Sequence, residues 1–453
     1  MAQKMKSSVK WIGFLMAVAI IVFSAILFDK CNKGKIAMPK LVYGNTSGGS
    51  TAVGSTSASS IPDGTLILKM GGESVMAESF APNLIKGYME KSGYKNVQIV
   101  NVKNGGTFIV GEKGGSKDKI EIMPKEDNVS YLDKGDIDIY MTSSEIHHSK
   151  YKEYVVGSDA IAIIVNNNSK ITSLTEDDLK DLFTSDKMTL YCSNENSCTY
   201  KTFHEFIMED KKIHQSSNKL NSDADVIDAV AKDDNGIGVI CYSQLSGHKV
   251  HAIPVTEDSK IPALLPNKNT IESENYPLTK DLYFYVNKSS DLANKLLTYI
   301  ETDEGQAIVS NEGFVNLNVG INSNKDNPEI ESSDPKDYKV IAGAYDELTT
   351  EFRFEVGSSD LNTRGLEDLP RVVSFLKKQG KSIILVGFTD NIGVPATNLA
   401  LSKSRALGVK KLLEAEGLSI STTYGFGDAH PIRTNSTTDD RGENRRVEIW
   451  IKK

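Results

Sequence analysis

A carboxylate and an arginine in the C-terminal quarter of the chain are of residue types that could bind charged groups. Asp390 follows a strand-like apolar run, and Arg405 lies in a helix-like segment shortly after it. In that segment Asn398, Ser402 and Arg405 recur at i, i+4 and i+7 and form a polar stripe. An arginine offers a planar fork to a carboxylate, and an aspartate accepts from an ammonium group. The alternative is a structural ion pair between Asp390 and Arg405.

The elements around these residues predict a compact α/β domain over residues 340–453. Their order is strand, helix, strand, helix and two further strands. In the second helix an apolar set also recurs at helical spacing, and we expect it to face the core of the domain. This set consists of Leu399, Ala406, Val409 and Leu413.

The polar stripe belongs to a longer pattern, N-x-x-L-S-x-x-R-A-x-x-V-x-x-x-L, over residues 398–413. With the preceding GFTD, the loop GFGDAHPIRTN and the closing NRRVEI, it resembles the peptidoglycan-associating pattern of OmpA-like domains, which have an α/β sandwich fold. The resemblance implies non-covalent binding to the diaminopimelate side chain of the peptidoglycan stem peptide, which has a carboxylate and an ammonium on one carbon. The residues that it places at this ligand are Thr389, Asp390, Asn398, Arg405 and Arg446.

Residues 65–320 alternate strand-like apolar runs with helical segments, which predicts an α/β fold with a mostly parallel sheet and two lobes. Thr175 and Asp178 form a capping-box arrangement at the start of one helix. LILKMGGESVMAESFAPNL, KGDIDIYMTSSEI and NGIGVICYSQL, in this order, resemble type 2 periplasmic substrate-binding proteins of the phosphate-binding class. The resemblance implies a ligand pocket between the lobes. Its candidate residues are Gly72, Glu73, Ser74, Lys125, Asp138, Ser143, Ser197 and Thr199.

This pocket departs from the family pattern at charged positions. Glu73 stands in a turn where small polar residues or threonine are usual, and Ser144 and Ser193 replace expected arginines. A carboxylate about 4 Å from a dianion costs several kcal/mol at an effective dielectric of about 20, so Glu73 would have to point away or Lys125 would have to compensate it. Three hypotheses stay open: a neutral or cationic solute, a weakly bound small anion, or an empty pocket in a domain that binds a protein partner.

The N-terminal segment 11–28 has 18 residues without a charge, which is long enough to span a membrane. We favour an uncleaved transmembrane anchor over a cleaved signal peptide or a lipoprotein signal that ends at Cys31. Residues 1–10 would then be cytoplasmic, 29–64 would form a flexible Gly/Ser/Thr linker, and 321–339 a second linker. Binding to peptidoglycan would place the domains in the periplasm, on a single-pass protein of the cell inner membrane.

Composition argues against several other functions. The formal net charge of −8 does not favour nucleic-acid binding, and the seven histidines and four cysteines lack metal-ligand spacing, so no cofactor is expected. The sequence has no nucleophile-elbow motif, which argues against an enzyme. Cys192 and Cys198 could form a disulfide in an oxidising periplasm, with Cys241 as an alternative partner or a buried thiol. The alternative overall function is a structural envelope linker or assembly component.

Overall fold

The computed structural model describes residues 60–102, 106–124, 129–146, 150–209, 211–245, 249–287, 290–322 and 334–453. The predicted transmembrane segment 11–28, Cys31, Lys125 and most of the first linker lie outside these residues. Among the helices that the structure describes, none combines the length and the apolar composition needed to cross a membrane.

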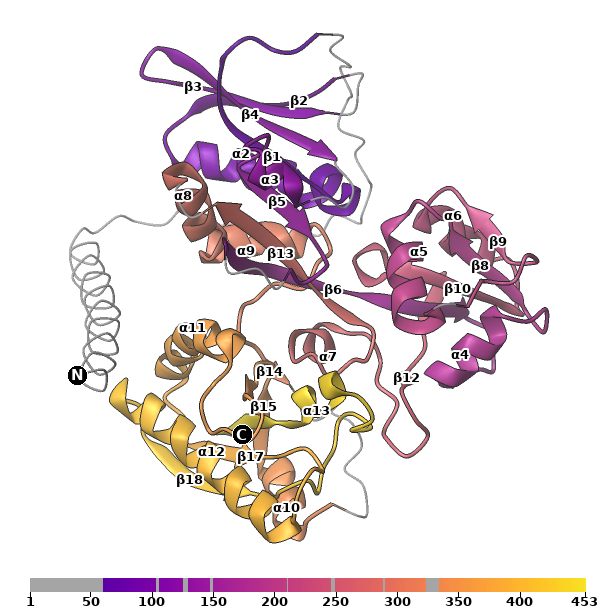
Figure 1. Ribbon diagram of the computed structural model, residues 1–453, viewed down its shortest axis with the longest axis vertical. Helices are drawn as coiled ribbons and strands as arrows, with labels where there is room; N and C mark the ends of the chain where they lie inside the picture. Colours follow the sequence, from indigo (N-terminus) through magenta and orange to yellow (C-terminus); the bar gives the residue numbers. More distant parts are fainter. Residues whose placement is uncertain are drawn as a thin grey trace, which may run out of the picture. The chain divides into compact units, whose positions relative to one another are not determined.

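The middle domain is built on an 11-stranded sheet with the order β2-β3-β4-β1-β5-β13-β6-β10-β8-β9, in which β11 pairs with β6 (Figure 1). The domain has two hydrophobic cores. The long strand β6 contributes residues to both of them, and β13, which pairs with β6, contributes to the first. The strands are β1 (Thr65–Gly72), β2 (Lys95–Asn101), β3 (Thr107–Lys113), β4 (Ser116–Pro124), β5 (Ile139–Thr142), β6 (Tyr151–Asn166), β8 (Thr189–Ser193), β9 (Asn218–Leu220), β10 (Gly236–Cys241), β11 (Val250–Ala252) and β13 (Thr279–Asn287). β7 (Leu174–Thr175) and β12 (Val255–Thr256) pair separately.

The sheet is mixed, so the expectation of a mostly parallel sheet was wrong. β1 pairs in parallel with β4 and β5, whereas β13 pairs antiparallel with both β5 and β6. β3 and β4 are joined by the tight turn Gly114–Gly115, and a connection this short allows only antiparallel neighbours.

Helices cover the two cores of the middle domain. The first core contains η1 (Met76–Phe80), α2 (Ala81–Lys91), α8 (Asp291–Ile300) and α9 (Asp303–Asn311), with α3 (Ser130–Asp133) beside β5. The second contains α4 (Glu176–Phe183), α5 (Cys198–Phe203), η2 (His204–Met208) and α7 (Lys268–Glu272), with α6 (Asp223–Val230) and η3 (Tyr242–Gln244) nearby. The predicted capping box is confirmed, because the Thr175 hydroxyl accepts from Asp178 N–H and the Asp178 carboxylate accepts from Thr175 N–H.

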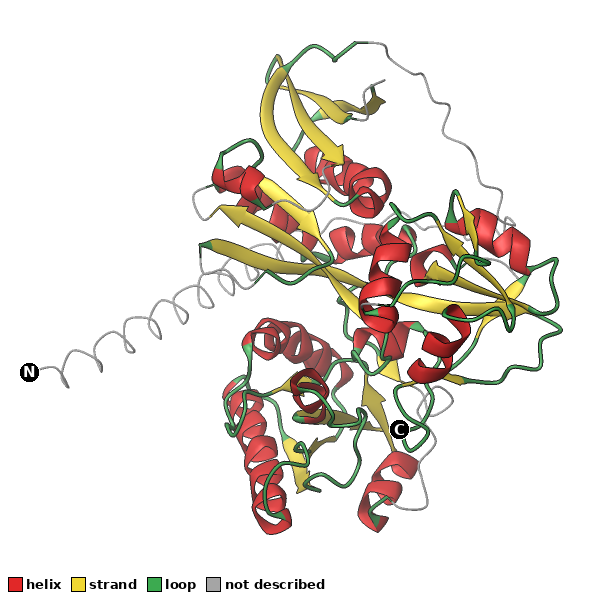
Figure 2. Cartoon of the chain, turned by 45° about the vertical axis from the view of Figure 1, so that its right-hand side comes forward, coloured by secondary structure: helices red, strands yellow, loops and turns green. Residues whose placement is uncertain are grey.

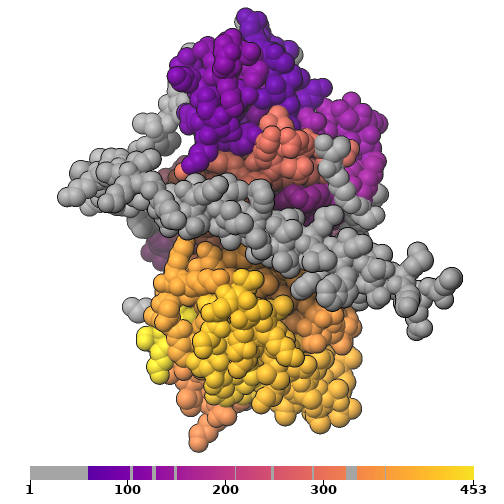
Figure 3. Space-filling view, turned by 90° about the vertical axis from the view of Figure 1, so that its left-hand side faces the viewer, coloured from indigo at the N-terminus to yellow at the C-terminus, as the bar shows by residue number. Residues whose placement is uncertain are grey.

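The C-terminal domain combines a six-stranded sheet with four helices (Figure 2; orange to yellow in Figure 3). The strand order is β14-β15-β19-β17-β18, with β16 paired to β19. Part of the predicted linker 321–339 belongs to this domain, because β14 pairs with β15 and α10 begins at Lys336. The elements are β14 (Ile321–Asn322), α10 (Lys336–Ala344), β15 (Tyr345–Leu348), β16 (Phe352–Arg353), α11 (Thr363–Gln379), β17 (Ile383–Gly387), α12 (Pro395–Ala415), β18 (Ile420–Gly425), α13 (Thr438–Asn444) and β19 (Arg446–Lys452).

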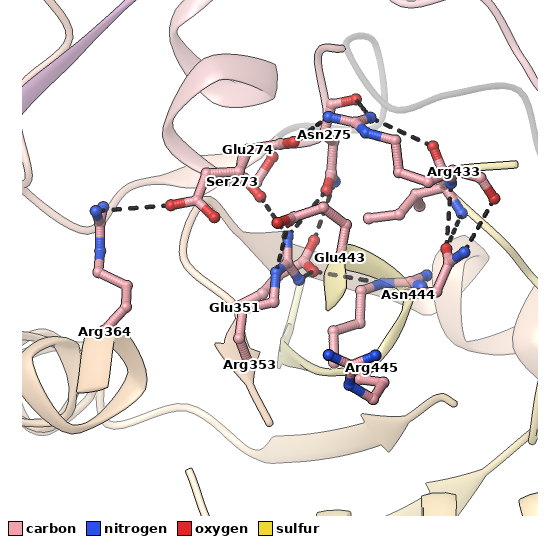
Figure 4. A network of polar contacts seen from close by, with 12 residues as sticks. Ser273, Glu274, Asn275, Glu351, Arg353, Arg364, Arg433, Glu443, Asn444 and Arg445 are labelled. Atoms are coloured by element: carbon pink, nitrogen blue, oxygen red, sulfur yellow. Dashed lines mark hydrogen bonds and ion pairs between the residues drawn. The ribbon is translucent and has the colours of Figure 1, made fainter. Parts of the chain in front are cut away.

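Buried arginines connect this domain to the segment 273–276 of the middle domain (Figure 4). Arg433 donates to the carbonyl oxygens of Glu274, Asn275 and Tyr276 at 2.6, 2.5 and 3.1 Å. It also forms an ion pair with Glu257 at 2.9 Å. Arg353 donates to the Ser273 carbonyl at 2.7 Å. These contacts satisfy backbone acceptors that would otherwise be buried without partners.

We expect Arg433→Met to lower the free energy of unfolding by about 2–3 kcal/mol, because Glu257 and three carbonyl oxygens lose their charged donor. Chemical denaturation of the full-length chain measures this. Lys377→Met is the control, since its partner Glu416 is a partly exposed carboxylate 3.8 Å away, and such pairs contribute about 0–1 kcal/mol. Equal losses in the two variants would show that the Arg433 contacts do not stabilise the chain.

Candidate functional site

The first candidate site lies where β17 ends and α12 begins. Asp390 follows β17 and is 9% exposed. Its Oδ1 accepts from Ile392 N–H at 3.1 Å, and its Oδ2 pairs with Arg445 Nη1 at 3.1 Å. Asn398 Nδ2 lies 3.4 Å from the Asp390 carbonyl oxygen. A short loop and the helix start therefore hold the carboxylate in one orientation.

Arg405 reaches the same site from α12 and does not pair with Asp390. Its Nη1 donates to the Phe388 carbonyl at 3.1 Å and its Nε to the Ser358 carbonyl at 2.9 Å. Burial and the nearby charge of Arg445 lower the pKa of Arg405 to about 10, and Asp390 only partly opposes this. The site thus holds two arginines and one aspartate, which is an excess of one positive charge suited to a carboxylate.

Two polar groups beside the charges have different roles. The Ser402 hydroxyl accepts from Gly427 N–H at 2.9 Å and so ties α12 to the loop after β18. Thr389 N–H donates to the Gly427 carbonyl at 2.9 Å, but the buried Thr389 hydroxyl oxygen has no hydrogen-bond partner. An unpaired buried hydroxyl costs about 1–3 kcal/mol, so a ligand group that hydrogen-bonded to it would be favoured.

The polar stripe of α12 faces inward, and one residue of the apolar set that was predicted to face the core does not. Asn398, Ser402 and Arg405 are buried, whereas Leu399, predicted to face the core, is 53% exposed. Gly387 allows α12 to approach the strand this closely, because a Cβ at Gly387 would lie 2.1 Å from the Ser402 carbonyl oxygen. The helix therefore lies directly against the strand ends, and its polar side chains meet the carbonyl groups there. Ala406, Val409 and Leu413 are buried as predicted.

Arg446 does not face this site, which corrects the role predicted for it. Its side chain is fully buried, with Nη2 at 2.6 Å and Nε at 3.1 Å from Glu448 Oε1 and the guanidinium 4.1 Å from the Phe388 ring centroid. Arg445 is the residue after helix α13 and Arg446 is the first residue of β19, and only one of the two adjacent arginines reaches Asp390. That arginine is Arg445. The stretch NRRVEI contained both, but nothing in its pattern selected between them.

The second candidate site is a cavity of about 560 Å³ in the middle domain. Five predicted pocket residues line it: Glu73, Ser74, Ser143, Ser197 and Thr199. Asp138 does not line the cavity, because its carboxylate accepts from Lys69 N–H at 2.8 Å and holds strand β1. Gly72 also has a structural role, since it is the last residue of β1 and lies directly against Met141.

The Glu73 carboxylate lies at the cavity wall and does not point away from it, as phosphate binding without compensation by Lys125 would require. Oε1 accepts from the Thr142 hydroxyl and from Ser143 N–H, both at 2.7 Å. Oε2 accepts from the Ser143 hydroxyl at 2.9 Å and from the Cys198 thiol at 3.4 Å.

A buried lysine that sequence reasoning missed lies behind Cys198. Lys280 is 5% exposed, and its Nζ donates to Cys198 Sγ and to the Thr202 hydroxyl, both at 3.2 Å. Burial opposes its charge, but Cys198, Cys241, Asp159 and Glu73 together hold the pKa of Lys280 well above its ordinary value. A lysine inside the apolar stretch LTKDLYFYV was the available signal, because lysines are rarely buried without a partner.

The disulfide that the sequence allows between Cys192 and Cys198 is not formed in the structure. Cys192, Cys198 and Cys241 are free thiols. Cys192 is buried in the second core, whereas Cys198 lies on the cavity wall. Among the described residues, no three or more His, Cys, Asp or Glu side chains are grouped as metal ligands.

Comparison with known proteins agrees with both parts of this architecture. A family model described as "PBP superfamily domain" matches residues 45–304, and one described as "OmpA family" matches residues 353–445. The chain therefore belongs to the PBP superfamily and carries an OmpA-family domain at its C-terminus. Both domains resemble binding and structural proteins rather than enzymes.

Individual relatives match one domain each. The probable lipoprotein YiaD of Escherichia coli is 37% identical over 101 residues, covering 22% of this chain and 46% of the relative. The phosphate-binding protein PstS of Staphylococcus saprophyticus is 27% identical over 190 residues, covering 37% and 58%. The peptidoglycan-associated lipoprotein of Pseudomonas aeruginosa is 30% identical over 139 residues, covering 30% and 78%. The chain spans about half the length of the first two of these relatives.

Proposed function

We propose that this protein binds peptidoglycan non-covalently through residues 340–453 and presents a solute-binding domain, residues 65–320, in the periplasm. Segment 11–28 would anchor it in the cell inner membrane as a single-pass protein. The ligand of the C-terminal domain would be the diaminopimelate of the stem peptide. Relatives of the OmpA-family domain include proteins named for their association with peptidoglycan, which supports this assignment.

One observation carries the proposal: two arginines and one aspartate, of which only Arg445 pairs with Asp390, lie beside a buried hydroxyl that has no partner. The excess positive charge favours the carboxylate of diaminopimelate. Asp390 then accepts from its ammonium group, and the Thr389 hydroxyl and Asn398 amide supply further hydrogen bonds. Arg405 contributes its charge and holds the loop, while Arg445 offers the guanidinium beside Asp390.

We expect Asp390→Ala and Arg445→Ala to weaken binding to purified sacculi at least tenfold, because each removes one charged partner of the ligand, worth about 1.5–3 kcal/mol. Cosedimentation of the full-length chain with sacculi measures this. Free diaminopimelate should compete with the sacculi, whereas cadaverine, which has the same two amino groups but no carboxylate, should not. Arg441→Ala is the matched control, because Arg441 donates to the nearby Asn435 carbonyl without touching Asp390. Wild-type binding by both site variants would refute the assignment.

The alternative is a structural envelope linker whose middle domain binds a protein partner. The occupied donors around Glu73 favour it, because they leave fewer groups for a solute. A thermal-shift screen of the full-length chain with small solutes separates the two functions, since a solute that binds only the folded state raises the melting temperature.

A further inference from the structure

The cavity of the middle domain contains a cluster of hydrogen-bond donors that converge on one point. The donors are the Thr142 hydroxyl, the Ser143 N–H and hydroxyl, and the Cys198 thiol. They come from the end of β5 and from the start of α5, which belong to the two different cores. Converging donors from an N–H and hydroxyls are the arrangement that stabilises a bound anion.

The group at this point is the carboxylate of Glu73, which comes from the chain itself. Its two oxygens accept four of these hydrogen bonds at 2.7 to 3.4 Å. The positive charge of Lys280 lies behind Cys198, with its Nζ 3.2 Å from the Cys198 sulfur. Donors and counter-charge are therefore already satisfied without a ligand.

The other cavity-lining residues that the structure describes add no net attraction for an anion. Its remaining charged side chains are Glu78, Asp223, Glu205 and Lys201, which leaves more negative than positive groups around the space. Asp223 is engaged with the Thr199 hydroxyl at 2.8 Å and with Cys241 N–H at 2.8 Å. An incoming dianion would meet the Glu73 carboxylate at short range and find the donors occupied.

We propose that Glu73 is a tethered substitute for an oxyanion, so that the cavity rejects phosphate and sulfate and admits a solute without a negative charge. This specificity rests on the proposed solute-binding role of the middle domain, and it does not depend on peptidoglycan binding. Removing the Glu73 side chain should free the donors and expose the charge of Lys280, which together would create an oxyanion site.

Isothermal titration of the purified full-length chain with sodium phosphate tests this inference. We expect no saturable binding by wild type at about 1 mM phosphate, and at least a tenfold gain in affinity for Glu73→Ser, equivalent to about 1.4 kcal/mol or more. Glu73→Thr is a second variant in case Glu73→Ser folds poorly, because threonine also lacks the carboxylate but fills more of the space that the Glu73 side chain leaves. Glu78→Ser is the matched control: it removes a negative charge from the same cavity but leaves the donors occupied, so no gain is expected.

Saturable phosphate binding by wild type would overturn the inference. An equal gain in phosphate affinity for Glu78→Ser would also overturn it, because the gain would then come from the lost negative charge and not from the freed donors. Failure of both folded Glu73 variants to bind phosphate would also overturn it, because the donor cluster would then be unable to hold an anion. Sacculus binding by every variant is expected to match wild type, so these outcomes are separate from a failure of the peptidoglycan assignment. If no uncharged or cationic solute in the thermal-shift screen stabilises wild type, the solute-binding role itself fails.

Discussion

Arg446→Met is expected to lower the free energy of unfolding of the C-terminal domain by about 3–5 kcal/mol. Arg446 is fully buried between Glu448 and Glu351, with contacts of 2.6 and 3.4 Å. Methionine preserves most of the volume but leaves these carboxylates without their cation in a buried environment. Glu347 adds little to the loss, because burial and the same two glutamates hold its pKa well above the ordinary value and so favour its neutral form. Chemical denaturation followed by circular dichroism measures the change.

The neighbouring variant Arg445→Met should show the opposite pattern and serves as the control. Arg445 pairs with Asp390 and donates from Nε to the Phe354 carbonyl at 3.1 Å, so its loss should reduce stability less and sacculus binding more. If Arg446→Met instead folds like wild type and loses sacculus binding, Arg446 is the ligand-contacting arginine after all.

Gly72→Ala is expected to destabilise the middle domain by about 4 kcal/mol or more. A Cβ at this position would lie 2.0 Å from the Met141 carbonyl oxygen, which is backbone and cannot move aside as a side chain can. The parallel strands β1 and β5 would have to separate, and with them Glu73 and its hydrogen bonds to Thr142 and Ser143. Substitutions that force backbone shifts in a filled core are among the most destabilising single changes.

Gly343→Ala is the matched control for this glycine effect. Gly343 lies in helix α10, is exposed, and would have no atom within 4 Å of an added Cβ. Alanine is favoured over glycine in a helix by about 1 kcal/mol, so this variant should be as stable as wild type or slightly more stable. The thermal unfolding midpoint separates the two variants, and similar midpoints would mean that β1 and β5 can move apart at little cost.

Several features could be predicted from the sequence because they depend on residues close together along the chain. The spacing of Asn398, Ser402 and Arg405 defined a polar helix stripe, and Thr175 and Asp178 defined a helix start. The ordered motifs of both domains indicated the two families that the comparisons show. Local hydrogen bonds and helical periodicity are sufficient to produce such features, and tertiary contacts change them little.

Other features were decided only by tertiary structure, because they join residues far apart in the sequence. Glu73 meets donors 69 and 70 positions later, at Thr142 and Ser143, and Lys280 meets Cys198 across 82 positions. The choice between Arg445 and Arg446 followed from their partners, which are Asp390 and Glu448 respectively, and close contact at Gly387 holds the polar stripe of α12 against the strand ends. Sequence spacing determined which residue types were available, whereas the packing of strands and helices decided which charges face a ligand and which charges hold the protein together.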